Sequence, residues 1–176
     1  MGTKLINYDD DRSFASRLRK KRIQILLSLI EAAHKKFART GPFRILDVGG
    51  TTLYWKLVPA PVLDKLNIEI VLLNLTEQAI PGDASRFTSI AGDACDLCHF
   101  ADNTFDLVHS NSVIEHVGTW GNMRRMASEM SRVGRALYVQ TPYFWFPIEP
   151  HFLMPMLHWL PMSLRCKLAM RMAMGN

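Results

Sequence analysis

A short apolar run that ends at two glycines is the feature that most restricts how this chain can fold. The run spans residues 43–48, and Gly49 and Gly50 follow it directly. A run without alternating polar side chains is typical of a strand that is covered on both faces, as in a parallel sheet. The two glycines indicate a tight turn at the end of this strand.

Further strands alternate with helical patterns along the chain. Strands are predicted over residues 68–75, 87–91, 105–109 and 136–140, and helices over residues 11–39, 53–57, 113–130 and 164–172. Pro59 and Pro61 are expected to end the second helix, and Gly118 and Gly121 to break the start of the third. This alternation predicts an α/β fold with a doubly wound, mainly parallel sheet of about five strands.

The charge pattern argues against a protein that coats nucleic acid. The net charge is +5, but residues 45–121 carry three Lys or Arg against ten Asp or Glu, so an acidic block lies between basic ends. Three cysteines, Cys95, Cys98 and Cys166, with no signal peptide before them, predict free thiols and a cytoplasmic protein. Cys95 to His99 spells C-x-x-C-H, which we interpret as a chance pair of loop thiols, and no metal site is expected.

Polar or small residues, and Leu75 beside one of them, stand at the ends of the first four predicted strands: Asp47, Gly49 and Gly50, then Asn74 and Leu75, then Asp93 and Ala94, then Ser110 and Asn111. In a doubly wound sheet, ligands bind at the carboxyl ends of the strands beside the point where the strand order reverses. The order and spacing of these pieces over residues 43–142 resemble those of the class I S-adenosylmethionine-dependent methyltransferases. The resemblance implies a Rossmann-like fold and S-adenosylmethionine as the cofactor.

The resemblance also implies roles for the residues after the first two strands. Asp47, Gly49 and the adjacent Gly50 match the glycine-rich motif that holds the amino-acid part of the cofactor. Asn74, with Leu75 beside it, stands where the family usually has an acid that binds the ribose hydroxyls.

The third and fourth strands complete the implied cofactor site. Asp93 matches the acid near the adenine amino group, and Ala94 would offer a backbone amide to the ring. Ser110 and Asn111 stand where the methionine end of the cofactor meets the acceptor. One cleft is therefore expected to be lined by Asp47, Gly49, Asp93 and Ser110.

The chain departs from the family pattern at three places. Thr51 and Leu53 stand where the motif usually has glycines, and Asn74 replaces the acid. The family's sheet also has seven strands, whereas five are predicted here. These departures leave an alternative open, in which the chain is a catalytically degenerate or truncated methyltransferase-fold protein that serves as a binding or partner module.

Catalysis by methyl transfer depends mainly on in-line positioning of the acceptor. A base helps when the acceptor is a neutral hydroxyl, and His116 is the first candidate because the pKa of a histidine lies near neutral. Glu115 is the second candidate.

The chain is predicted to be a single methyltransferase-like domain, with an N-terminal helix (11–40), a cofactor-binding core (43–140) and an irregular, aromatic-rich segment (141–176). The last segment is interpreted as an acceptor lid or an interface. It would hold a small-molecule or lipid-like acceptor through Tyr143, Trp145, Glu149 and His151. Packing under further residues, or contact with a membrane surface, are the alternatives. An unpaired edge strand would also allow a homodimer.

Overall fold

The structure is a computed structural model of the whole chain, and it describes residues 14–37, 41–82, 85–141 and 160–173. The chain forms two compact units, residues 1–140 and 141–176. The described part of the second unit contains one helix, α5 (Met162–Ala173), which confirms the short C-terminal helix. Within the described residues, no helix has both the length and the apolar character that crossing a membrane requires.

The first unit contains a five-stranded sheet in which every neighbouring pair is parallel. Its strands are β1 (Phe43–Val48), β2 (Ile68–Asn74), β3 (Phe87–Ala91), β4 (Leu107–Asn111) and β5 (Leu137–Gln140). The spatial order is β3-β2-β1-β4-β5, so the chain direction across the sheet reverses between β1 and β4. The predicted Rossmann-like α/β fold is confirmed, and the carboxyl ends of β1 and β4 form its switch point.

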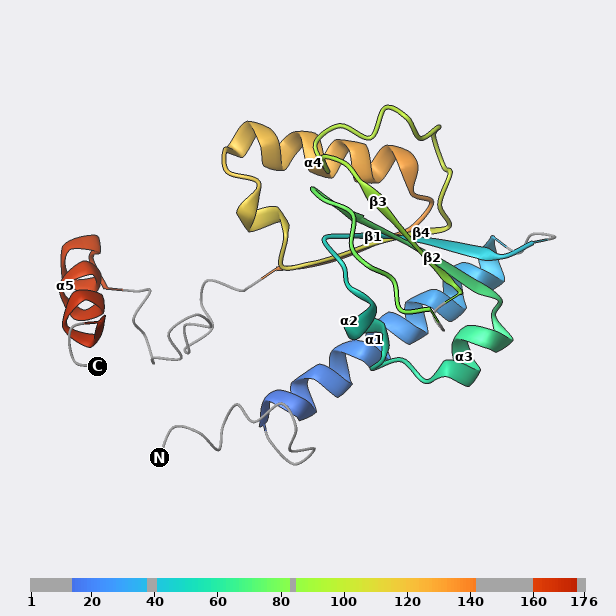
Figure 1. Cartoon of the computed structure of the whole chain (residues 1–176), viewed down its shortest axis with the longest axis horizontal. Helices are drawn as coiled ribbons and strands as arrows, with labels where there is room; N and C mark the ends of the chain where they lie inside the picture. The colour runs from blue at the N-terminus through green and yellow to red at the C-terminus, as the bar shows by residue number, and fades with distance from the viewer. Residues whose placement is uncertain (1–13, 38–40, 83–84, 142–159, 174–176) are drawn as a thin grey trace. The chain divides into compact units, whose positions relative to one another are not determined.

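Helices cover both faces of this sheet (Figure 1). One face carries α1 (Phe14–Lys36), α2 (Thr52–Trp55) and α3 (Ala60–Lys65), and the other carries α4 (Trp120–Val133), which follows the short 3-10 helix η2 (Ile114–His116). These layers explain why β1 carries apolar side chains on both of its faces. Ile45 packs into the cluster that contains Leu26 and Ile30 of α1, whereas Leu46 packs into the cluster that contains Met126 of α4.

Two helical predictions needed correction. The helix α2 ends before Pro59 as predicted, but Pro59 and Pro61 also begin a further helix, α3, that was not predicted. A proline is tolerated in the first helical turn because an amide there has no partner within the helix. The single helix expected over 113–130 is divided into η2 and α4. Gly118 lies between them with a φ of +90°, and Thr119 begins α4 by accepting a hydrogen bond from the Asn122 amide at 3.2 Å.

Candidate functional site

Two loops at the switch point separate two cavities. The loop after β1 contributes Gly49 to one cavity and Thr51 to the other. The loop after β4 likewise contributes Val113 to the first cavity, and Asn111 and Ser112 to the second. The first is called the β2-side cavity and the second the β5-side cavity. A ligand in one would therefore lie only a few residues of chain away from a ligand in the other.

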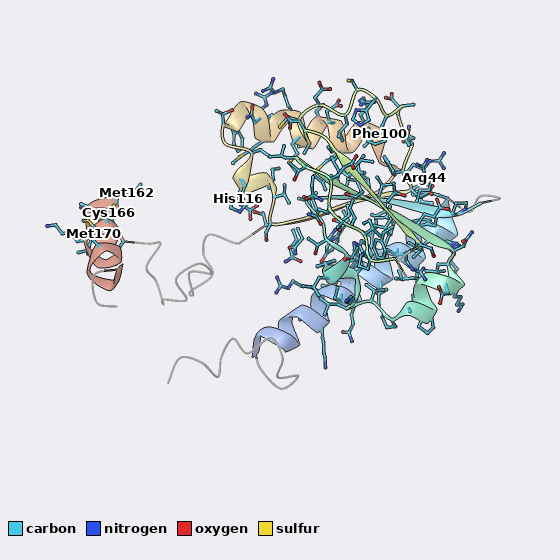
Figure 2. The ribbon with its side chains drawn as sticks, in the orientation of Figure 1. Arg44, Phe100, His116, Met162, Cys166 and Met170 are labelled. Carbon is cyan, nitrogen blue, oxygen red and sulfur yellow. The ribbon has the colours of Figure 1, made fainter. Side chains whose placement is uncertain are left out.

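The β2-side cavity brings together residues that were predicted from four separate parts of the sequence. It has a volume of about 560 Å³. Six predicted site residues line it: Gly49, Asn74, Leu75, Asp93, Ala94 and His116. His116 lies on η2, before α4 (Figure 2), and its side chain is exposed. His116 thus shares a cavity with the residues predicted to bind the cofactor.

The turn after β1 requires both of its glycines. Gly49 has a φ of +73°, and a Cβ there would lie 2.3 Å from Val113 Cγ2. A Cβ on Gly50 would lie 1.7 Å from Asp47 Oδ2. The Gly49 amide also donates to the Leu73 carbonyl at 2.8 Å, which joins the turn to β2.

Asn74 holds the same turn from the end of β2. Its Nδ2 donates a hydrogen bond to the Gly50 carbonyl at 3.0 Å. An aspartate at this position could not donate that bond. The departure from the family's acid therefore has a structural reason, and the Asn74 Oδ1 still offers an acceptor to a ligand hydroxyl in the β2-side cavity.

Asp93 and Ala94 begin the loop after β3. Asp93 Oδ1 accepts a hydrogen bond from the Cys95 amide at 2.8 Å, which fixes the orientation of this exposed carboxylate. Ala94 is buried beside it. Gly92 precedes them where a Cβ would lie 2.8 Å from Leu73 Cδ1, so the loop packs closely on β2.

Asp47 and Ser110 lie beneath the cavity walls rather than on them. Asp47 is fully buried, and its Oδ2 accepts a hydrogen bond from Trp55 Nε1 at 2.7 Å. Ser110 is 1% exposed, and its Oγ has no hydrogen-bond partner among the described residues. Of the four residues expected to line one cleft, only Gly49 and Asp93 line the β2-side cavity. The other two are buried near the ends of β1 and β4, where packed side chains cover them.

Sequence reasoning missed a buried polar cluster on the α2 side of the sheet. His109 is 1% exposed, and its Nδ1 lies 2.5 Å from Asp47 Oδ1 while its Nε2 lies 3.2 Å from the Tyr54 hydroxyl. Tyr138 of β5 stacks on the same imidazole, with the ring planes 6° apart. A histidine inside an apolar strand was the available signal, because the parallel register pairs His109 directly with Asp47.

The β5-side cavity, of about 350 Å³, lies above this cluster. Its walls come from α1, the β1–α2 connection, and the ends of β4 and β5: Arg22, Ile23, Thr51, Leu53, Tyr54, Leu57, Asn111, Ser112 and Gln140. Burial raises the pKa of Tyr54 above its usual range, and the neighbouring Tyr138 and Asp47 raise it further. The Tyr54 hydroxyl therefore stays protonated at neutral pH.

Glu115 is half-buried on η2 and lines neither cavity. The four predicted acceptor-binding residues, Tyr143, Trp145, Glu149 and His151, lie outside the described residues.

The cysteines after β3 are free thiols. Burial raises the pKa of Cys95, and a hydrogen bond with Asp96 raises that of Cys98. Within the part of the chain that the structure describes, no group of three or more His, Cys, Asp or Glu residues could hold a metal ion.

Comparison with known proteins points to methyl transfer. A family model described as a methyltransferase domain matches residues 46–136. No curated protein sequence matches the chain.

Among solved structures, the DszA carbon methyltransferase is 19% identical with a TM-score of 0.52, over 72% of this chain and 36% of that one. A SAM-dependent methyltransferase from Aquifex aeolicus is 16% identical with a TM-score of 0.46, over 82% and 78%. A putative methyltransferase from an antibiotic biosynthesis pathway of Anabaena variabilis is 18% identical with a TM-score of 0.42, over 64% and 45%. The chain thus spans less than half the length of the first and third of these proteins.

Proposed function

Because the chain belongs to the methyltransferase domain family, we propose that it transfers a methyl group from S-adenosylmethionine to a small-molecule or lipid-like acceptor. When bound, the cofactor supplies an electrophilic methyl group on a sulfonium. The protein's part is to hold cofactor and acceptor in line, which can account for much of the rate of such a transfer.

The β2-side cavity is the proposed cofactor site. Its residues fit the chemistry of the cofactor: the Asp93 carboxylate can accept from the adenine amino group, and the Asn74 carbonyl can accept from a ribose hydroxyl. Gly49 brings backbone rather than a side chain to the cavity, which leaves room for the methionine part. Leu75 and Ala94 offer apolar surface to the ring. We assign Asp47 and Gly50 to holding the turn.

The β5-side cavity is the proposed acceptor site. It adjoins the cofactor site across the two switch-point loops, and Asn111 lines it. The buried Ser110 precedes Asn111 directly, and its Oγ has no hydrogen-bond partner among the described residues. His116 and Glu115 remain candidate bases, and Tyr143, Trp145, Glu149 and His151 remain candidate lid residues.

The single observation that carries this proposal is that one cavity collects Gly49, Asn74, Asp93 and Ala94 from three strand ends. Calorimetric titration of the 176-residue chain with S-adenosylmethionine and S-adenosylhomocysteine tests it. We expect micromolar binding of both. Asp93→Asn should weaken binding about tenfold, because hydrogen bonds to charged groups are roughly twice as strong as neutral ones. Glu77→Gln is the matched control, since it removes the same charge beside the cavity from a residue that does not line it.

No binding by a folded chain would contradict the proposal and favour the non-catalytic alternative.

The partner predictions are tested separately. β5 is one of the two outer strands of the described sheet, and its Leu137 and Val139 are 39% and 45% exposed, which supports a homodimer through this edge. Light scattering should then report twice the chain mass. Co-sedimentation with anionic vesicles tests the membrane contact.

A further inference from the structure

Three side chains form a continuous hydrogen-bonded chain from the interior to the β5-side cavity. Asp47 Oδ1 lies 2.5 Å from His109 Nδ1, and His109 Nε2 lies 3.2 Å from the Tyr54 hydroxyl. Asp47 and His109 are almost completely buried, whereas Tyr54 is half-buried and lines the cavity. The chain of contacts therefore ends at a residue that lines the cavity.

The chemistry of the three groups determines which group donates each hydrogen bond and which accepts it. A carboxylate only accepts, so a neutral His109 holds its proton on Nδ1 and donates it to Asp47. His109 Nε2 is then an acceptor, and the Tyr54 hydroxyl donates to it. The lone pairs of the Tyr54 oxygen are left for a donor that approaches from the cavity.

We propose that Asp47, His109 and Tyr54 form a proton relay that takes the proton from a hydroxyl-bearing acceptor, an alcohol or a phenol, in the β5-side cavity. This inference rests on the proposed function. Tyr54 would be the catalytic residue that contacts the acceptor, and His109 and Asp47 would be positioning residues that act through it.

The step is balanced in atoms and charge. The acceptor oxygen forms a bond to the methyl carbon, and the bond from that carbon to the cofactor sulfur breaks. The acceptor's proton passes to the Tyr54 oxygen, and the Tyr54 proton passes to His109 Nε2. The positive charge of the sulfonium thus reappears on the imidazolium, where the Asp47 carboxylate stabilises it before the proton leaves to solvent.

The surroundings of His109 suit this role. The charged and titratable groups that face the cluster are Asp47 from β1, Tyr54 from α2, Tyr138 from β5 and Arg22 from α1. The Tyr138 ring stacks on the imidazole, and its hydroxyl lies 3.4 Å from the Arg22 carbonyl rather than on a ring nitrogen. Among the described residues, Tyr54 alone therefore contacts the Nε2 atom of His109.

The first test requires no acceptor. Histidine-directed ¹⁵N NMR of the full chain reports which ring nitrogen of His109 carries the proton, and the loss of signals in His109→Gln assigns them. The relay requires a proton on Nδ1 and none on Nε2. We also expect Tyr54→Phe to shift the Nε2 signal, while Tyr138→Phe, the matched control, leaves it in place. A proton on Nε2, a doubly protonated ring, or no response to Tyr54→Phe would overturn the relay.

The second test compares acceptors that differ in whether they must lose a proton. Transfer of a labelled methyl group is measured with an alcohol, a phenol and a carboxylic acid as probes; the last is already ionised at neutral pH. Tyr54→Phe should slow transfer to the two hydroxyl probes about 100-fold and leave transfer to the carboxylate within twofold. Equal losses on all three would overturn the relay. Cofactor binding by calorimetry should be unchanged in Tyr54→Phe, so loss of the proposed function and loss of the relay are separate results.

Discussion

Asp47 determines which residues can stand around it. Its carboxylate is fully buried and is bound by Trp55 and His109, so it cannot move aside without leaving a buried charge unpaired. A Cβ on Gly50 would lie 1.7 Å from this carboxylate. The glycine is thus required by a side chain three residues earlier and not by an unusual φ.

Gly50→Ala should therefore lower the free energy of unfolding by about 2 kcal/mol, in the range of overpacked cores. Urea denaturation measures it. Gly82→Ala is the control, because a Cβ at Gly82 would meet nothing within 4 Å. Equal stabilities of the two variants would show that Asp47 can relax, contrary to the geometry.

Asn74 is the residue at which the family pattern and the structure diverge most informatively. Asn74→Asp restores the acid of the pattern but removes the donor to the Gly50 carbonyl. We expect the free energy of unfolding to fall by about 1 kcal/mol, the usual net value of such a bond. Thermal denaturation measures this change, and an unaltered midpoint would mean that this bond does not hold the turn.

At the scale of elements, α4 holds the loop after β3. Arg132 of α4 donates to the Phe100 and Leu97 carbonyls at 2.7 and 2.9 Å, and Glu129 accepts from the Leu97 amide at 2.8 Å. This loop begins at Asp93 and Ala94, which line the β2-side cavity. The α4 contacts therefore support one wall of the proposed cofactor site.

The same contacts predict a pH dependence of stability. The hydrogen bond from Arg132 lowers the pKa of Glu129 below its usual 4.5. A group whose pKa is lower in the folded state stabilises above its unfolded pKa, and the contribution is lost as the pH falls through the folded value. The stability difference between wild type and Glu129→Gln should thus be full at pH 7 and shrink below pH 4.5. A Glu129→Gln difference that stays constant as the pH falls would contradict the prediction.

Elements were predictable where local pattern and tertiary packing agree. β1 and β3 were predicted with the observed bounds, because each carries its strand-forming residues in a single short run. α3 was missed because Pro61 was interpreted as a helix stop. β4 begins two residues later than predicted, because Phe105 and Asp106 pair with adjacent segments of this chain without being part of the strand. The pairing of Asp47 with His109 needed the register of β1 and β4, which no local pattern contains.

At the scale of the whole molecule, the described residues of the proposed cofactor site belong to the first unit. Those that line the β2-side cavity fall between Val48 and Asn122. Both apolar clusters of the described core also lie within that unit, from Ile23 to Tyr138. Cofactor binding should accordingly be independent of the second unit, whereas the proposed lid function should not.

A chain that ends at Thr141 tests this separation. Saturation with S-adenosylmethionine at about 100 times its Kd should stabilise either form by about 2.7 kcal/mol, which raises the Tm by about 5–10 °C. We expect the same shift in the full and the shortened chain, because the residues that hold the cofactor are common to both. Differential scanning fluorimetry measures both forms side by side. A shortened chain that folds but shows no shift would mean that residues after Thr141 complete the cofactor site. If the shortened chain keeps its Tm shift but no longer transfers a methyl group to any acceptor, the second unit acts on the acceptor alone.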